Sequence, residues 1–421
     1  MADSARPHLL LKMDVSAAGV RNKLLLGDLD GDGRMELVLV QGNGGIDDRY
    51  VPHQVQCVTA YGLDGCQLWQ KGIPDPDAGS SGSDFPAQIA DIDGDGRNEV
   101  LCVMEGRFLV LDGRTGEEKQ AFDLPGEYAH DCIILANLSG GEQATDIILK
   151  DRYHTLWALD RYFNLLWTYE GNPGHFPWVH DFDGDGRDEV MAGYDMLDHD
   201  GTLRWSCRDL EDHADCIWVG DVSVTGGKQI VIGGSVTVMY DPDGAELWRY
   251  SGSVESQHIA LGKFRSDLPG LQVAGLDRII RGDKDNNFSE SGKDALFLLD
   301  RDGRELWKEE RTTSGWLTIV ETVRHWDDSG LDYIFAYRRG GGIHPALYNG
   351  HMEETVTFPI DGMAAYADLT GAGSTHILIY TDVEVHVYGS RPGTLDAARP
   401  GEALAQPKRL YSSTLYPGGE Y

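Results

Sequence analysis

The stretch GDLDGDGRMELVLV at residues 27–40 decides the fold, because it returns almost unchanged along the chain. ADIDGDGRNEVLCV follows at residues 90–103 and HDFDGDGRDEVMAG at residues 180–193. In each copy an acidic turn rich in Asp and Gly separates two short apolar runs, which is the pattern of two strands joined by a turn. Five weaker copies keep the same frame, and they begin at Ala136, Gly220, Gly262, His325 and Ala367.

The eight copies recur with a mean period of about 49 residues between Asp28 and Asp368. Hairpins such as LDGCQLW (63–69) and LDRDGRELW (299–307) follow the copies. Asp-Gly between alternating apolar residues is a strong hairpin signal, so each unit supplies four short antiparallel strands. A period of about 40–50 residues in an all-β chain is typical of a propeller. We therefore predict an all-β, eight-bladed β-propeller that forms a single domain over residues 1–421.

The last repeat lacks a fourth strand after Tyr388, and a strand at about residues 8–13 is expected to complete it. Such closure leaves only short, protected sheet edges. A stretch rich in Pro, Gly and Ala begins at Arg391, and we expect residues 391–421 to form a surface tail. A Trp ends five of the hairpins, which indicates packing between blades rather than sugar stacking: Trp69, Trp167, Trp205, Trp248 and Trp307.

Charge and composition exclude several classes of partner. The 421 residues include 69 acidic and 36 basic side chains, for a formal net charge of −33. The negative charge of such a chain repels nucleic acid. The sequence contains no stretch of 18 apolar residues, so no membrane span is predicted. The six cysteines have no C-x-x-C spacing, which indicates reduced thiols. With no signal-peptide core near the N-terminus, a cytoplasmic location is expected.

The three strong acidic turns have the spacing of calcium-binding loops. Carboxylates stand at positions 1, 3, 5 and 9, and position 7 offers a backbone carbonyl. Hard oxygen ligands at alternating positions suit Ca²⁺, and the glycines permit tight curvature. We predict three structural Ca²⁺ sites, whereas the weaker copies have lost most carboxylates and are expected to bind nothing. The predicted metal-site positions are Asp28, Asp30, Asp32, Arg34, Glu36, Asp91, Asp93, Asp95, Arg97, Glu99, Asp181, Asp183, Asp185, Arg187 and Glu189.

Propeller topology places these turns on one face of the ring and the ligand-binding connections on the other. The connections expected on that second face lie between blades and between the second and third strands of a blade. His and Arg gather there although the chain is poor in basic residues, which indicates a small anionic ligand. Members of this group include Lys23, His130, Lys150, Arg152, His175, His213, His258, Arg278, Arg281 and Arg338.

Three stretches carry a resemblance to a known family. GNPGHFPWVHDFDGDGRDEVMAGYDMLDHDG (171–201), DHADCIWVGD (212–221) and KDRYHTLWALD (150–160) are similar to family 11 rhamnogalacturonan lyases and their FG-GAP relatives. The resemblance covers most of residues 20–390 and implies an eight-bladed, calcium-binding propeller. His213-Ala214-Asp215 stands where that family carries a similar His-x-Asp. The chain is shorter than typical members and lacks their fibronectin-like extension, so imported oligosaccharides fit better than polymeric pectin as substrates.

The resemblance and the cationic face together imply a lyase that cleaves oligosaccharides of rhamnogalacturonan or rhamnose–glucuronate type by β-elimination. This reaction requires that the C6 carboxylate is neutralised, the C5 proton removed and O4 protonated. The proton-transfer candidates are His130, His213, His258 and Tyr153, and the substrate-binding candidates are Lys150, Arg152, His175, Arg281 and Arg338. Two alternatives stay open, namely a glycoside hydrolase on the same oligosaccharides and a non-catalytic, calcium-dependent propeller that binds sugar or protein.

Overall fold

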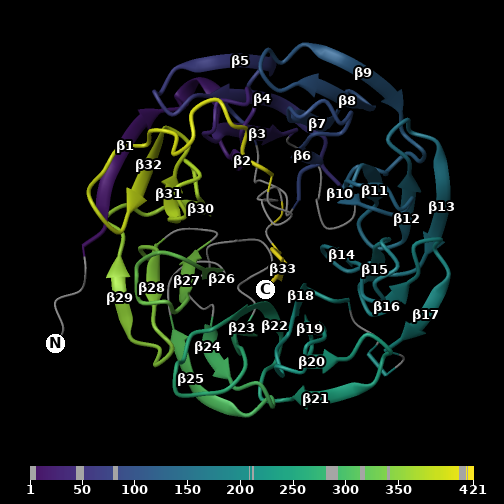
Figure 1. Cartoon of the computed structure of the whole chain (residues 1–421), viewed down its shortest axis with the longest axis vertical. Coiled ribbons are helices and arrows are strands. Elements are labelled where there is room, and N and C mark those ends of the chain that lie inside the picture. The colour runs from purple at the N-terminus through teal and green to yellow at the C-terminus, as the bar shows by residue number, and fades with distance from the viewer. Residues whose placement is uncertain are drawn as a thin grey trace.

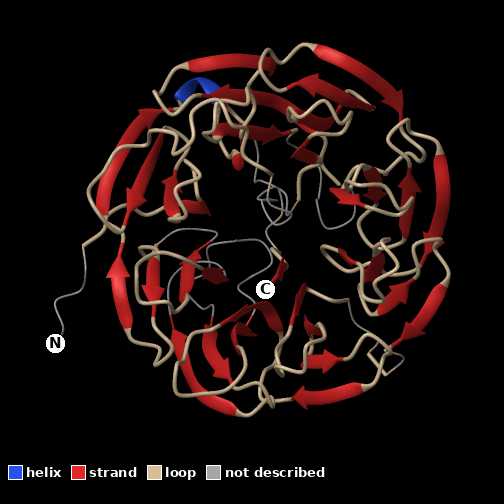
Figure 2. Cartoon of the chain, in the orientation of Figure 1, coloured by secondary structure: helices blue, strands red, loops and turns tan. Residues whose placement is uncertain are grey.

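Eight β-sheets stand around a common centre in the computed structural model (Figures 1 and 2). The structure describes residues 6–43, 52–78, 84–207, 209–210, 213–280, 293–312, 318–338, 342–406, 414 and 416–421. Within them the one helix is a 3-10 turn at Ser16–Ala18. No helix in these ranges has the length and apolar character needed to cross a membrane. The chain is thus an all-β, eight-bladed propeller, as predicted.

Each of the first seven blades takes four consecutive strands, with the first innermost and the fourth outermost (Figure 1). Blades 1 and 2 contain β2 (Lys23–Gly27), β3 (Glu36–Gly42), β4 (Val55–Tyr61), β5 (Gln67–Gly72), β6 (Ala87–Ala90), β7 (Glu99–Met104), β8 (Arg107–Asp112) and β9 (Glu118–Asp123). Blades 3 and 4 contain β10 (Ile133–Ala136), β11 (Asp146–Lys150), β12 (Thr155–Leu159), β13 (Leu165–Glu170), β14 (Trp178–His180), β15 (Glu189–Ala192), β16 (Asp195–Leu197) and β17 (Leu203–Ser206).

The second half of the ring repeats this arrangement. Blades 5 and 6 contain β18 (Cys216–Gly220), β19 (Gln229–Gly233), β20 (Thr237–Tyr240), β21 (Glu246–Tyr250), β22 (Ser256–Gly262), β23 (Gln272–Ile280), β24 (Lys293–Leu299) and β25 (Glu305–Thr312). Blades 7 and 8 contain β26 (Thr318–Val323), β27 (Tyr333–Arg338), β28 (Ala346–Tyr348), β29 (Glu354–Thr357), β30 (Met363–Ala367), β31 (His376–Tyr380) and β32 (Glu384–Gly389).

The outer strand of blade 8 comes from the other end of the chain. β1 (His8–Asp14) pairs antiparallel with β32, from His8 opposite Gly389 to Asp14 opposite Glu384. The segment expected at residues 8–13 therefore lies at this edge. Because β1 completes the sheet of β30, β31 and β32, blade 8 has four strands and the two ends of the chain close the ring.

The C-terminal tail lies on the surface only in its first part. Residues 391–406 are mostly exposed and run over the first acidic turn, where the Leu404 N–H donates to Asp28 Oδ2 at 2.7 Å. The last residues turn inward instead, and β33 (Gly419–Glu420) pairs in parallel with the inner strand β18 near the centre of the ring (Figure 1). Gly418 makes this possible, because a Cβ there would lie 2.4 Å from the Ile217 carbonyl oxygen. The expected surface location is therefore wrong for residues 416–421.

Apolar side chains fill the space between neighbouring blades, and the Trp residues join the blades at the rim. The Trp167 indole N–H donates to the His199 carbonyl in the next blade at 2.8 Å. Gly201 packs beneath that indole at φ +83°, where a Cβ would lie 2.8 Å from the ring. Trp69, Trp205 and Trp248 make the same bond to Gly113, Pro242 and Arg301. The prediction of packing between blades is confirmed for these four residues.

Candidate functional site

The two faces of the ring carry different chemistry because strand topology separates their connections. The acidic turns 28–35, 91–98 and 181–188 all join a first strand to a second strand. His130, His175 and His213 lie at the other strand ends, in the connections that lead into β10, β14 and β18. The predicted separation of acidic turns from the histidine-rich face therefore follows from the observed strand order.

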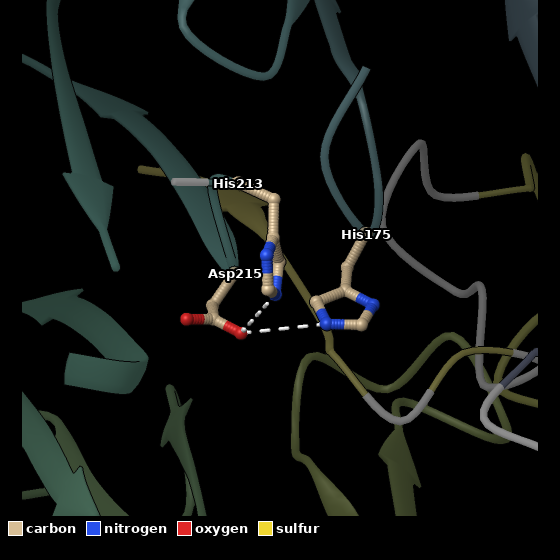
Figure 3. Close-up of side chains that lie close together, drawn as sticks. All are labelled: His175, His213 and Asp215. Atoms are coloured by element: carbon tan, nitrogen blue, oxygen red, sulfur yellow. Dashed lines mark ion pairs between the residues drawn. The ribbon is translucent and has the colours of Figure 1, made fainter. Parts of the chain in front are cut away.

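His175, His213 and Asp215 lie close together on the histidine-rich face, with both imidazoles directed towards the Asp215 carboxylate (Figure 3). His175 precedes β14, whereas His213 and Asp215 immediately precede β18. Asp215 Oδ1 lies 3.4 Å from His175 Nε2 and 3.6 Å from His213 Nε2. The Asp215 side chain is buried and the His213 side chain is 23% exposed, so His213 is the member of this trio that a ligand reaches. Burial raises the pKa of Asp215 to about 6, although His213 acts in the opposite direction.

Tyr153 joins this group from the loop between β11 and β12. Its ring centroid lies 5.2 Å from that of His213 and 5.6 Å from that of His175. Burial raises the pKa of the Tyr153 phenol, so the hydroxyl keeps its proton at neutral pH. An open hollow beside the two rings is lined by Tyr153, His154, Thr155, Glu170, Gly171, Asn172 and His213.

The C-terminal tail supplies an aromatic side chain that sequence reasoning missed. Tyr416 stacks on His175 with ring centroids 3.5 Å apart, and its ring is also parallel to that of His258 at 5.7 Å. His258 is fully buried there. The tail lies outside the eight repeats, so the repeat frame holds no signal for the position of Tyr416.

Lys150 and Arg152 lie in a buried network of charges. Lys150 Nζ bonds to the Asp131 carboxylate, and Arg152 Nη1 lies 3.2 Å from Asp84 Oδ2 and 3.3 Å from Asp131 Oδ1. Against the effect of burial, Arg152 and Lys150 lower the pKa of Asp131. These cations neutralise buried carboxylates between blades 2 and 3. The expectation that they present open positive charge at the mouth is corrected, because only 2% of Arg152 and none of Lys150 is exposed.

The other sequence-based candidates make contacts of their own. Arg338 is buried with Nη2 3.4 Å from Asp294 Oδ2, and Arg278 forms a buried pair with Glu255. His130 is buried with Nδ1 3.3 Å from the His53 carbonyl, and burial lowers its pKa. Arg281 lies outside the described residues. The structure thus brings together His175, His213 and Tyr153, with His258 behind Tyr416.

The acidic turns form compact clusters of oxygen atoms on the opposite face. Both oxygens of Asp28 accept backbone N–H bonds, from Gly31 at 2.7 Å and Gly33 at 3.1 Å. Burial raises the pKa of Glu36 to about 8, and the neighbouring carboxylates of Asp30 and Asp28 add to the rise. Among the described residues, four groups of three side chains have possible ligand atoms within 4.8 Å of one another and could hold a metal ion. They are Asp28, Asp30 and Asp32; Asp91, Asp93 and Glu99; Asp181, Asp183 and Glu189; and His175, His213 and Asp215.

Position 9 of each turn also has a role that needs no metal. The Glu36, Glu99 and Glu189 carboxylates accept the backbone N–H of position 2, the first at 2.8 Å. In the weaker copies the Gln229 and Gln272 side chains accept the backbone N–H of Ser223 and Arg265 at 3.0 and 2.8 Å, and His376 Nδ1 accepts that of Leu369 at 3.4 Å. The turn therefore keeps its shape where carboxylates have been lost.

Comparison with known proteins confirms a distant resemblance to family 11 rhamnogalacturonan lyases. No protein-family model matches the chain. In sequence it is 26% identical over 263 residues to rhamnogalacturonan exolyase YesX of Bacillus subtilis, and 26% identical over 292 residues to rhamnogalacturonan endolyase YesW of the same organism. These alignments cover 48% and 52% of this chain, and only 42% and 46% of the two lyases. The chain therefore matches less than half the length of either curated relative.

The fold is shared over almost the whole chain. The exotype rhamnogalacturonan lyase YesX superposes with a TM-score of 0.68 at 17% identity, covering 99% of this chain and 80% of that chain. The Vibrio cholerae biofilm matrix protein Bap1 superposes with a TM-score of 0.62 at 12% identity, covering 98% of this chain and 96% of that chain. At these identities the superpositions show the fold alone.

Proposed function

We propose that the protein is a lyase that cleaves uronic-acid-containing oligosaccharides of rhamnogalacturonan or rhamnose–glucuronate type by β-elimination. Sequence similarity to two rhamnogalacturonan lyases supports the substrate class. The observation that carries the proposal is the pairing of Tyr153 and His213, whose rings lie 5.2 Å apart and line one open hollow. Proton transfer at C5 and at O4 needs two such groups at neighbouring points of one sugar.

In this proposal His213 removes the C5 proton, and Asp215 beside it stabilises the imidazolium that results. The electrons of the C5–H bond form the C4–C5 double bond as the bond from C4 to O4 breaks. Tyr153 gives its proton to the departing O4, which fits a phenol whose pKa is raised by burial. Tyr416 and Asp215 hold the neighbouring His175 in place without entering the proton balance.

The C6 carboxylate of the substrate also needs a positive partner. Arg152 and Arg338 are buried against carboxylates, so we do not assign a carboxylate clamp to either of them. The His175, His213 and Asp215 donors fit a divalent cation, since their ligand atoms lie within 4.8 Å of one another. A cation held there would supply charge neutralisation, and His213 would then serve as a ligand. Tyr153 would in that case have to be ionised beside the cation, so that it takes the C5 proton and returns it to the departing O4.

We further propose that the acidic turns bind Ca²⁺ as structural sites and that the protein works in a reducing compartment such as the cytoplasm. Oxygen-only donor sets support calcium, with clustered carboxylates at positions 1, 3 and 5 in blade 1 and at positions 1, 3 and 9 in blades 2 and 4. All six cysteines are free thiols, which supports the reducing compartment.

The test is incubation with rhamnogalacturonan and rhamnose–glucuronate oligosaccharides while ultraviolet absorbance is followed. A rise from an unsaturated uronate supports the lyase. Saturated fragments would indicate a hydrolase, and either that result or the absence of cleavage would refute the proposal. Tyr153→Phe should remove most of the activity while thermal unfolding stays near normal. His213→Ala should do the same, and loss of wild-type activity on metal removal would favour the cation arrangement over the base.

A carbohydrate-binding propeller without catalysis is the second candidate. It is favoured by one observation, which is that the hollow beside Tyr153 and His213 is open and lined by aromatic and polar side chains, as a sugar-binding surface requires. Calorimetric binding of the same oligosaccharides without cleavage would support this function. The His213→Ala and Tyr153→Phe variants would then weaken binding in place of turnover.

A further inference from the structure

The start of the fourth strand has a β-bulge in each of the first seven blades. At this point the register with the third strand shifts, and one residue of the fourth strand has no partner opposite. The unpaired residue is leucine in blades 1, 3, 5 and 6, namely Leu68, Leu166, Leu247 and Leu306. In blades 2 and 4 it is a cation, Lys119 and Arg204 respectively.

Both cations reach the acidic turn of their own blade. Lys119 Nζ lies 2.5 Å from Asp93 Oδ2 and 2.8 Å from Glu99 Oε1. Arg204 Nη1 lies 2.9 Å from Asp183 Oδ2 and 3.1 Å from Glu189 Oε1. In each case the partners are positions 3 and 9 of the turn, so two different side chains from equivalent bulges bridge the same pair of carboxylates.

Blade 1 has the third strong acidic turn and a different bulge residue. Leu68 is 45% exposed there and carries no charge. Within the described part of the chain, no lysine or arginine lies within 4.0 Å of the carboxylates at positions 3 and 9, Asp30 and Glu36. The three turns have the same carboxylates at positions 1, 3, 5 and 9. Blade 1 has a cation on a different carboxylate, because Arg34 Nη2 lies 2.7 Å from Asp32 Oδ2 at position 5. The turns therefore differ in whether a cation of the blade bridges positions 3 and 9.

We propose that Lys119 and Arg204 are built-in counter-ions that compete with Ca²⁺ for the turns of blades 2 and 4. A metal ion that uses the carboxylates at positions 3 and 9 has to displace an ammonium or guanidinium group already bonded to them. In blade 1 Arg34 pairs with the single carboxylate at position 5, so a metal ion displaces a cation from one carboxylate rather than two. This turn therefore binds Ca²⁺ most tightly, and the other two turns stay neutralised when calcium is scarce. This inference rests on the proposed Ca²⁺ sites and is independent of the lyase proposal; a wild type that binds no Ca²⁺ would refute the sites themselves, whereas Ca²⁺ binding that the variants leave unchanged would refute the counter-ion role.

The experiment is a calorimetric Ca²⁺ titration of the full-length protein after removal of metal by a chelator. Lys119→Leu installs the residue that four other blades carry at this bulge, and it should raise the calcium affinity of one turn by about tenfold, or about 1.4 kcal/mol. Arg204→Leu should do the same for a second turn. Leu68→Lys is the reverse exchange, and it should weaken the tightest site by a similar factor.

Arg249→Leu is the matched control. Arg249 lies just past the bulge of blade 5 and pairs with Asp209 and Glu246, so the variant removes the same charge without touching an acidic turn. Its titration should equal that of the wild type. Thermal unfolding of the metal-free proteins gives a second measurement, in which Lys119→Leu should lose stability that added Ca²⁺ restores.

Unchanged titrations in both Lys119→Leu and Leu68→Lys would overturn the proposal, as would a loss of calcium affinity in Lys119→Leu. If Lys119→Leu does not fold, Lys119→Gln and Leu68→Lys give the same comparison. Inactivity towards oligosaccharides would leave these titrations unaffected, so failure of the lyase proposal and failure of this one are distinguishable.

Discussion

Replacing Lys150 by Met should destabilise the ring strongly, because it removes one cation from the buried charge network. Lys150 Nζ bonds to the Asp131 carboxylate and donates to the Asp151 and Arg152 carbonyls, each at 3.0 Å. Its side chain and that of Asp131 are both fully buried. Met keeps most of the volume, so the change isolates the loss of charge. Arg152 would remain as the cation shared by Asp131 and Asp84.

The expected loss in the free energy of unfolding is about 3–5 kcal/mol, the usual cost of leaving a buried charge without its partner. Unfolding entropy is about 2.1 cal/mol/K per residue, which amounts to about 0.9 kcal/mol/K for the 421 residues. The melting temperature should therefore fall by about 3–6 °C.

Scanning calorimetry measures this shift, and Lys12→Met is the control. Lys12 pairs with Glu384 at 2.6 Å but its side chain is 55% exposed, so its removal should cost less than about 1 kcal/mol and shift the midpoint by about 1 °C or less. Adding Asp131→Asn to Lys150→Met should recover part of the loss, since the unpaired charge is then gone. A midpoint for Lys150→Met equal to that of Lys12→Met, or no recovery in the double variant, would contradict the assignment of a structural role.

Three further predictions concern the turns and the rim. Chelation of calcium should lower the melting temperature measured by calorimetry. Asp30→Ala and Asp181→Ala should also lower it, while the absorbance assay should show near-normal turnover by the folded protein. Gly201→Ala should cost at least about 1–2 kcal/mol in a denaturant titration, because φ is +83° and the new Cβ meets Trp167. Burial lowers the pKa of His376, so the stability that this neutral acceptor contributes is present above about pH 6.5 and lost as the pH falls below it. When melting temperatures are measured over a series of pH values, His376→Gln should reduce their fall at acid pH. An unchanged fall would contradict this reasoning.

Most of the fold was predictable because repetition multiplies a weak signal. A single turn such as residues 28–35 indicates only a hairpin, but its return at residues 91–98 and 181–188 sets a period, and the period specifies blades. The same frame assigns each connection to a face, which is why His213 and Tyr153 could be expected on one side before their rings were seen to lie 5.2 Å apart.

The rest depends on contacts between blades that no repeat encodes. The abundance of cations at one mouth indicated an open positive surface, but whether Arg152 faces solvent depends on Asp84 and Asp131, which come from the connections entering blades 2 and 3. Tyr416 reaches His175 from a tail with no counterpart in the repeats. Sequence periodicity therefore locates backbone connections well and leaves charge pairing and tail placement undetermined.

The pairing of β1 with β32 has a consequence for how the protein is made. Asp14 meets Glu384, a partner that leaves the ribosome roughly 370 residues later, on the order of 20–70 s at ordinary rates of synthesis. Throughout that time β1 is an unpaired strand, and seven blades can form before it has anything to join. Closure by β1 consequently waits until β32 has been made, and until then the β1 strand of one molecule can pair with β32 of another. Because a chain's own β1 is tethered to it, this strand exchange competes with closure only at high protein concentration.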